Sequence, residues 1–419
     1  VGGRDAMSPG SFGALVVAAA LSVVMTGQAA PQLAEDQAEG PLAILEGGLP
    51  GTIKIPNTGL SMGFGGYVKL DVNMSSRGAE AAGGTNAGDQ FVIPSLIPVG
   101  EVPDDGYQLT FNARESRIWW KAFMPTDWGN FNAYVEVDFY AFQSPGDERV
   151  SNSFAPRMRH AYGTLGPLLA GQTWSTFMNA SSIPDALDFV GSTGATFARQ
   201  PQIRWTQPIG ELFSILVAVE SPETTATSSV GARVTPGDDR IPDIVLGAKV
   251  SGTFGNVTLT FIGRELRADN GNGSSLFAGG ASVAGRVFVA ERDNIRFNFT
   301  AGTGLGRYVS LNTVNAAFWN DDGHLQSAIP TFSGHFAYQH HWSSLFRSSA
   351  TFSFLQALHP EELSDRPVTN QVLGGIVNLL FSPIPRTTFG VEYYVARRSV
   401  ETGEDGVLHR FQSSAKFVF

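Results

Sequence analysis

Arginine side chains recur along this chain at positions that alternate with apolar residues. In the run from Ile295 to Phe299, for example, Arg296 stands between an isoleucine and a phenylalanine. An arginine guanidinium is a planar, permanently charged fork that can pair with both oxygens of a carboxylate. The candidate binding residues with this chemistry are Arg117, Arg157, Arg159, Arg204, Arg264, Arg286, Arg296 and Arg347. Their type and spacing predict a surface that recognises small anions.

Two carboxylates, Glu136 and Asp138, share the predicted polar face with these arginines. An ion pair between neighbouring strands would brace the wall, and Arg117, Arg157 and Arg159 are each able to form one with these two acids. We therefore expect some of the cations to be structural. The remaining inward cations outnumber the inward carboxylates, and an uncompensated basic surface attracts anions.

The elements that would position these side chains are β-strands. Successive strand side chains point to opposite faces, and the last ten residues place Phe411, Ser413, Ala415, Phe417 and Phe419 together on one face. A terminal strand of this kind looks like the closing strand of an outer-membrane β-barrel. The alternative is an edge strand of a soluble sandwich. A cation at the lipid-facing midplane costs about 2–4 kcal/mol, so the charged residues belong to the lumen.

Hydrophobic alternation predicts sixteen strands joined alternately by short turns and long loops, which is typical of a transmembrane barrel. They are at about 64–74, 108–124, 130–142, 157–165, 168–174, 199–208, 211–220, 242–251, 255–267, 280–290, 293–305, 330–340, 343–356, 370–382, 386–398 and 408–419. The phase of the second strand is ambiguous. The fold class is thus all-β, a transmembrane antiparallel β-barrel over residues 61–419.

One long loop, residues 175–198, is more apolar than a solvated loop requires. Its apolar side chains favour burial, and the barrel interior offers it. We expect this loop, with Pro184, Asp185 and Asp188, to fold inward and narrow the pore. Packing over the barrel mouth or against a neighbouring subunit is the alternative.

The N-terminal residues predict export. Residues 14–25 form an apolar run too short for a membrane helix, which needs about 20 residues, and suited to a signal peptide over 1–29. Residues 30–60 are rich in proline, glycine and acidic residues and are expected to be a periplasmic segment. The chain has no cysteine, so disulfides are excluded. A net charge of −10 argues against nucleic-acid binding.

Catalytic chemistry finds little support. The seven histidines are scattered, with no His/carboxylate spacing for a metal and no glycine-rich phosphate loop. A hydrolase on a barrel would need a serine and a histidine on adjacent strands, and His335 with Ser353 is the conceivable pair. We expect no enzyme activity, no cofactor and no metal.

Several segments together resemble the DcaP-like family of trimeric outer-membrane porins. They are 54–56, Gly65–Asp71, Glu115–Arg117, Val135–Phe139, Arg159–Gly163, Leu169–Phe177, Asp188–Gly191 and Arg199–Arg204. The resemblance covers mainly residues 54–208 and the final strand. It implies a sixteen-stranded trimer that takes up small anionic solutes such as dicarboxylates and aromatic carboxylates. Residues 30–53 lack the heptads of the coiled-coil segment that precedes the barrel in some members.

The sequence therefore predicts an outer-membrane porin for passive diffusion of small anionic solutes, dicarboxylates or aromatic carboxylates. The alternatives are a general non-selective porin and a non-conducting structural or adhesin barrel. The expected partners are small anionic solutes, outer-membrane lipid and lipopolysaccharide, two further copies in a homotrimer, and the outer-membrane assembly machinery through the strand ending at Phe419.

Overall fold

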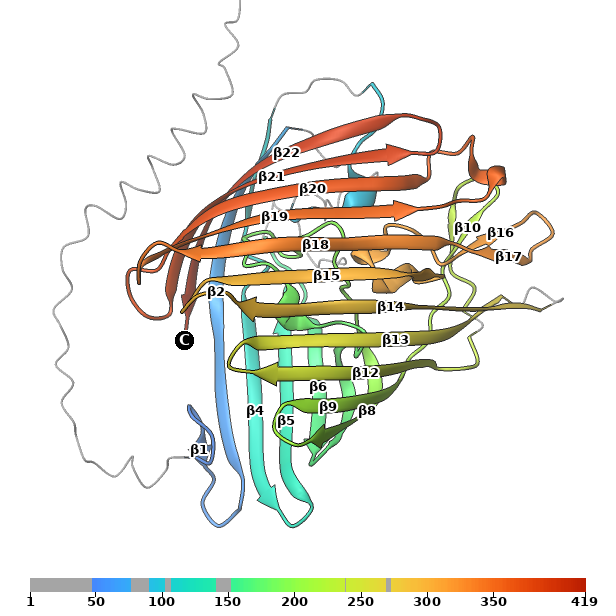
Figure 1. Ribbon diagram of the computed structural model, residues 1–419. Helices are drawn as coiled ribbons and strands as arrows, with labels where there is room; N and C mark the ends of the chain where they lie inside the picture. Colours follow the sequence, from blue (N-terminus) through green and yellow to red (C-terminus); the bar gives the residue numbers. More distant parts are fainter. Residues whose placement is uncertain (1–46, 77–89, 102–106, 141–151, 238, 269–272) are drawn as a thin grey trace, which may run out of the picture.

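A computed structural model of the protein describes residues 47–76, 90–101, 107–140, 152–237, 239–268 and 273–419. In these ranges one antiparallel sheet curves round and closes on itself (Figure 1). The predicted signal peptide and the first part of the predicted periplasmic segment lie outside the described residues. Within the described residues, no helix is both long enough and apolar enough to cross a membrane.

The barrel wall contains sixteen strands, as predicted, when β3 and β4 are taken as two parts of one strand. They are β2 (Ser61–Ser75), β3 (Gln108–Asn112) with β4 (Arg117–Thr126), β5 (Gly129–Asp138), β6 (Arg157–Leu165), β7 (Leu168–Trp174), β8 (Arg199–Ile209), β9 (Phe213–Glu220), β12 (Asp243–Gly252), β13 (Gly255–Ala268), β14 (Ser274–Phe288), β15 (Asn294–Thr303), β18 (Pro330–His341), β19 (Phe346–Ala357), β20 (Thr369–Phe381), β21 (Thr387–Val400) and β22 (Asp405–Val418). Each pairs antiparallel with its neighbours, and β2 pairs with β22 to close the ring. The short β1 (Ile53–Lys54) pairs with the start of β2.

The second wall strand, predicted at about 108–124, is interrupted at residues 113–116, which contain one residue more than the segment of β2 opposite them. Asp71 of β2 pairs with Asn112, whereas Tyr67, four residues earlier, pairs with Arg117, five residues later. Two strands in perfect register would advance by the same number of residues, so the extra residue is a β-bulge. It reverses the alternation, which explains why the phase of this strand is ambiguous in the sequence.

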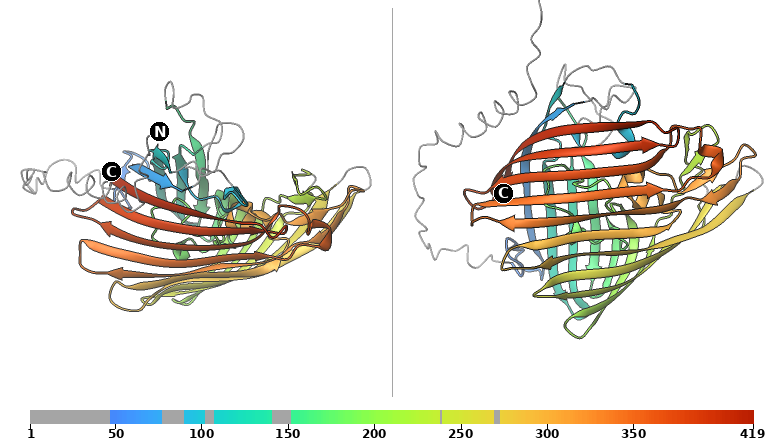
Figure 2. Two further views of the ribbon diagram at one scale, coloured as in Figure 1. Left: turned by 90° about the horizontal axis from the view of Figure 1, so that it is seen from above. Right: turned by 45° about the horizontal axis from the view of Figure 1, so that its top comes forward.

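Short turns and long loops lie at opposite ends of the barrel, and the C-terminus lies at the end with the short turns (Figures 1 and 2). Two of the long loops carry structure that the sequence analysis left out. They form a separate four-stranded sheet of β11 (Arg233–Val234), β10 (Ala226–Ser228), β16 (Ala317–Trp319) and β17 (Leu325–Ala328). The pairing of β10 with β16 is parallel and ties the two loops together.

The wall is apolar outside and polar inside, as the alternation predicts. On β22, Phe417 is 48% exposed on the outer face, whereas Arg410 and Gln412 are 2% exposed on the inner face. On β2, Phe64 and Val68 are exposed, while Lys69 and Asp71 are buried. Exposing apolar side chains to water is unfavourable, whereas their contact with lipid carries no such penalty. An apolar outer face therefore suits a barrel in a membrane.

In the part of the chain that the structure describes, three segments lie in the barrel interior. Residues 175–198 fold inward as predicted and carry the single-turn η3 (Ala180–Ser182). Residues 90–101 with η2 (Pro94–Leu96), and residues 304–316 with η4 (Gly306–Tyr308) and η5 (Ser310–Asn312), join them. Phe91 and Tyr140 pack with Phe197 and Val190 in one cluster of buried side chains. The sequence analysis predicted only the first of these three segments.

Candidate functional site

A second β-bulge concentrates basic side chains on one part of the inner wall. Glu136 of β5 pairs with His160 of β6, but the next residue, Val137, pairs with Met158. Arg159 is therefore the extra residue on β6. Bulges re-aim side chains next to functional sites, and here the extra residue brings Arg159 inward together with Arg157.

Both arginines are held by the two carboxylates that the sequence pointed to. Arg157 forms a two-pronged ion pair with Asp138, with Nε–Oδ1 at 2.9 Å and Nη2–Oδ2 at 2.7 Å. Arg159 lies 2.5 Å from Glu136 Oε1 and 2.9 Å from Asp138 Oδ2. Arg117 reaches Glu136 at 3.6 Å. We call these five residues the braced wall, because each of its three arginines has a carboxylate partner in the wall.

The tip of the inward loop lies against the braced wall through an aromatic ring. The guanidinium carbons of Arg159, Arg157 and Arg117 lie 5.3, 5.4 and 5.9 Å from the centroid of the Phe189 ring. An arginine over an aromatic face is attracted by the ring quadrupole. The contact between the loop and this basic surface is thus made by Phe189 rather than by the two aspartates of the loop.

The loop is fixed on the opposite side by its backbone. Glu392 of β21 accepts hydrogen bonds from the backbone N–H groups of Leu187 and Asp188, at 2.7 and 2.9 Å. Lys69 and Gln412 donate to the carbonyl oxygen of Leu187, at 2.7 and 3.1 Å. Groups from three wall strands therefore hold one short stretch of the loop, which explains how it stays inside the barrel.

Asp188 and Asp185 have different partners. Asp188 accepts hydrogen bonds from the N–H groups of Val92, Val190 and Gly191, at 2.8, 3.0 and 3.1 Å. Burial raises the pKa of the Asp188 carboxyl. The positive charge of Arg410, at 3.9 Å, opposes this rise. Asp188 thus links the inward loop to the second inward segment. The preceding Pro184 accepts a hydrogen bond from the Ala186 N–H at 3.0 Å, within the bend.

Asp185 faces another basic part of the wall. Its Oδ2 lies 2.8 Å from Nε of Arg347 and also accepts a hydrogen bond from Gln339. The side chains of Asp185 and Arg347 are 29% and 23% exposed, so this ion pair is in contact with solvent. Asp185 therefore lowers the positive charge of the wall opposite the braced wall.

Arg286 of β14 and Arg296 of β15 are cross-strand partners in the register of these two neighbouring strands. Arg296 donates to the carbonyl of Ile183 at 2.7 Å, to Asn294 at 3.0 Å and to Gln339 at 3.1 Å, all neutral acceptors. Arg286 lies 5.0 Å from the ring of Phe288. Among the described residues, neither arginine has a carboxylate within ion-pairing distance. We call Arg286 and Arg296 the open wall.

The other two predicted arginines differ from each other. Arg204 of β8 lies on the inner face, and it forms no ion pair with a described carboxylate. Arg264 is 3% exposed and pairs with Asp243 at 3.0 Å. It also donates to the carbonyls of Gly304 and Leu305, at 2.7 and 3.2 Å. Arg264 therefore anchors the third inward segment and does not present a free guanidinium to the pore.

A cavity of about 470 Å³ lies beside the braced wall, between the three inward segments. Besides Arg157, it is lined by Arg199, Arg233 and Arg307, none of which was among the predicted site residues. Arg199 opens β8, and the sequence analysis quoted it only within a family-like segment. Arg233 and Arg307 lie in long loops, where alternation gives no orientation, so a sequence pattern could not identify them.

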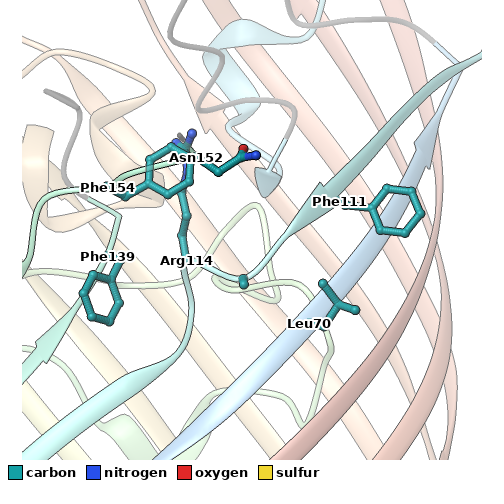
Figure 3. Close-up of a pocket in the computed structure, with 7 residues that line it drawn as sticks. Leu70, Phe111, Arg114, Phe139, Asn152 and Phe154 are labelled. Atoms are coloured by element: carbon teal, nitrogen blue, oxygen red, sulfur yellow. The ribbon is translucent and has the colours of Figure 1, made fainter. Parts of the chain in front are cut away.

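Another pocket, of about 450 Å³, lies at the bulge between β3 and β4 (Figure 3). Leu70 and Phe111 on its rim are 44% and 65% exposed and belong to the apolar outer face. The guanidinium carbon of Arg114 lies 3.4 Å from the Phe154 ring centroid. This pocket is separate from the basic surfaces of the lumen. In the described ranges, no group of three or more His, Cys, Asp or Glu side chains is arranged to hold a metal ion.

The pattern of the DcaP outer membrane protein family matches residues 66–419, which is most of the chain. The chain belongs to this family. Family membership and the closed barrel place the protein in the outer membrane as a channel-forming β-barrel. No curated protein matches the chain significantly.

Three solved structures illustrate the similarity of fold. The outer membrane channel DcaP of Acinetobacter baumannii is 18% identical with a TM-score of 0.71, and the match covers 86% of this chain and 97% of that one. An anion-selective porin from Comamonas acidovorans is 9% identical with a TM-score of 0.54, over 86% and 100%. OmpT of Vibrio cholerae is 10% identical with a TM-score of 0.51, over 87% and 99%.

Proposed function

We propose that this channel lets small anionic solutes diffuse passively across the outer membrane. The observation that carries the proposal is the open wall, where Arg286 and Arg296 face the lumen side and have, among the residues that the structure describes, only neutral partners. Arg204 and three of the cavity arginines, Arg199, Arg233 and Arg307, add positive charge that no described carboxylate pairs with. In a narrow, low-dielectric channel such charges raise the local concentration of anions.

Dicarboxylates and aromatic carboxylates are the proposed solutes. A guanidinium pairs with both oxygens of a carboxylate, and Arg204 and Arg296 lie on separate strands of the wall. A solute with an acidic group at each end is therefore suited to contacts with two sites. Binding must remain weak, because conduction requires that the solute leave again.

The proposed assembly is a homotrimer in contact with outer-membrane lipid and lipopolysaccharide. The exposed aromatic and aliphatic side chains of the outer face, such as Phe64 and Phe336, suit an apolar environment. The final strand, which ends at Phe419, is the proposed signal for the outer-membrane assembly machinery. Chemical cross-linking of the purified protein in detergent, read on gels, tests the trimer.

Ion selectivity in a planar bilayer tests the function. Under a salt gradient at low ionic strength, we expect the reversal potential to lie toward the equilibrium potential of the anion. A reversal potential near zero would support the general non-selective porin instead. A protein that inserts as a heat-modifiable barrel and conducts no ions would support the structural or adhesin barrel. A reversal potential on the cation side would contradict the basic lumen.

A further inference from the structure

Aromatic side chains form a continuous row across the inner face of three adjacent wall strands. The row consists of Trp119 on β4, Tyr134 on β5 and Tyr162 on β6. Their chain neighbours Ile118 and Val135 are exposed on the outer face, so alternation turns the three rings inward. The ring centroids of Trp119 and Tyr134 are 6.4 Å apart, and those of Tyr134 and Tyr162 are 5.8 Å apart. We call these three residues the aromatic platform.

A glycine on the neighbouring strand lets the first ring of the platform lie flat against the wall. Gly65 of β2 pairs with Trp119, and a Cβ atom at Gly65 would overlap the indole ring. The indole therefore covers the backbone of β2 with one face, which leaves the opposite face on the lumen side. The planes of the Trp119 and Tyr134 rings differ by only 25°, so the two rings are nearly parallel.

Hydrogen-bonding side chains flank the aromatic platform. Arg117 and Lys121 lie two residues before and after Trp119 and so share its face of the strand. The side chain of Arg117 is 20% exposed, and Nζ of Lys121 lies 5.4 Å from the Trp119 ring. Beside the two tyrosines, Asn132 Nδ2 donates to Thr164 Oγ1 at 2.9 Å. Flat apolar surface is thus combined with charged, amide and hydroxyl groups.

The aromatic platform lies between the braced wall and the end of the barrel that has the short turns. Along β4, Trp119 follows Arg117 and precedes the turn that begins after Thr126. The described lining of the cavity of about 470 Å³ contains none of the three rings. The platform is therefore a separate surface, which a solute meets on the other side of the inward loop from the long loops.

We propose that the aromatic platform is a binding site for pyranose sugars passing through the channel. The face of a pyranose carries weakly positive C–H groups, which are attracted to the negative face of an aromatic ring. Its rim carries hydroxyl groups, which both donate and accept hydrogen bonds. A purely aromatic solute would offer the flanking Asn132 and Thr164 no partner. The inference goes beyond the proposed passage of anions and does not require it.

Reduction of the ionic current by two matched probes tests the site. Maltotriose is a chain of pyranose rings, whereas polyethylene glycol of the same hydrodynamic radius has no ring. In planar bilayers containing the full-chain protein in potassium chloride, we expect maltotriose to reduce the current saturably, at concentrations at least about fivefold lower than polyethylene glycol. Equal, non-saturating reductions by both probes would overturn the site. The reversal potential reports anion permeation independently, so failure of one proposal is distinguishable from failure of the other.

Matched tryptophan substitutions test the residues. Trp119→Leu removes one ring of the platform, and the half-blocking concentration of maltotriose should rise about fivefold. Trp128→Leu makes the same change at a side chain that is 82% exposed in the turn between β4 and β5, and should leave that concentration unchanged. Neither substitution alters a charge, so the reversal potential should stay constant in both. Equal shifts of the half-blocking concentration in the two variants would contradict the assignment.

Substitutions at Tyr134 repeat the test on a second ring and decide the matter if Trp119→Leu does not fold. Tyr134→Phe keeps the ring and loses the hydroxyl that donates to Glu136 at 2.8 Å, whereas Tyr134→Leu loses both. We expect Tyr134→Phe to retain most of the binding and Tyr134→Leu to weaken it about fivefold. Heat-modifiable migration on gels identifies the folded variants. A folded Tyr134→Leu variant with unchanged maltotriose block, or equal losses in both variants, would overturn the role of the ring.

Discussion

The braced wall and the open wall contain the same type of side chain in opposite electrostatic situations. Asp138 is fully buried and is shared by Arg157 and Arg159. Arg286 and Arg296 are set against each other on paired strands with no described carboxylate between them. Like charges placed directly opposite destabilise a sheet, whereas breaking a buried ion pair leaves an uncompensated charge. An arginine in this lumen can therefore serve stability or selectivity, depending on its partner.

The largest expected effect is on the braced wall. Asp138→Asn leaves Arg157 and Arg159 without their shared carboxylate, and breaking a buried pair in this way costs about 3–5 kcal/mol. The free energy of unfolding, measured by urea titration of the heat-modifiable band, should fall accordingly. Asp405→Asn removes the carboxylate of the exposed pair with Arg397 and is the control, with an expected change within about 0.5 kcal/mol. Equal stability of both variants would break the comparison.

The double variant Arg286→Gln, Arg296→Gln acts on the open wall. A unit charge attracts an anion by about 1 kcal/mol at 4 Å in water, which corresponds to about fivefold in local concentration. The anion-to-cation permeability ratio should therefore fall by about fivefold or more, as measured by the reversal potential. The free energy of unfolding should stay constant or rise, because a like-charge contact is removed. A large loss of stability would show that these arginines are also structural.

Asp185→Asn should shift selectivity in the opposite direction by a smaller amount. The substitution releases Arg347 from a partly exposed ion pair and adds positive charge to the lumen near the open wall. Solvent screens such a pair, and exposed pairs contribute about 0–1 kcal/mol, so the rise in anion preference should be smaller than the loss in the double variant. The reversal potential measures it, and a shift toward cations would contradict the placement of Asp185.

Added salt should weaken the electrostatic effect of the open wall more than that of the braced wall. This is the smallest of the four expected effects. Raising the ionic strength from 0.1 M to 1 M shortens the Debye length from about 10 Å to about 3 Å. The anion preference of the natural protein should decline, because the open wall acts through solvent. The unfolding free energy that Asp138 contributes should change little, because its ion pairs are buried. An anion preference unaffected by salt would point to direct binding in place of a screened field.

The sequence was sufficient for the wall because each strand position is decided locally. Side chains alternate along a strand between the face toward lipid and the polar face toward the lumen. This alternation alone places Arg296, Glu392 and Arg410 inward, without knowledge of any partner. The inward folding of residues 175–198 also followed from composition, since apolar side chains in a loop favour burial. The sixteen strands and the outer-membrane location follow from the same two signals.

The tertiary structure alone decided which arginines are neutralised. A single extra residue at Arg159, and another between Asn112 and Arg117, changes the register and so chooses the ion-pair partners. The cavity depends on residues 90–101 and 304–316, whose positions inside the barrel are set by contacts with distant strands. Such contacts, like that of Arg398 with the carbonyl of Ile97, join residues far apart in the chain. Alternation along one strand contains no information about them, because it reports only the two sides of the wall.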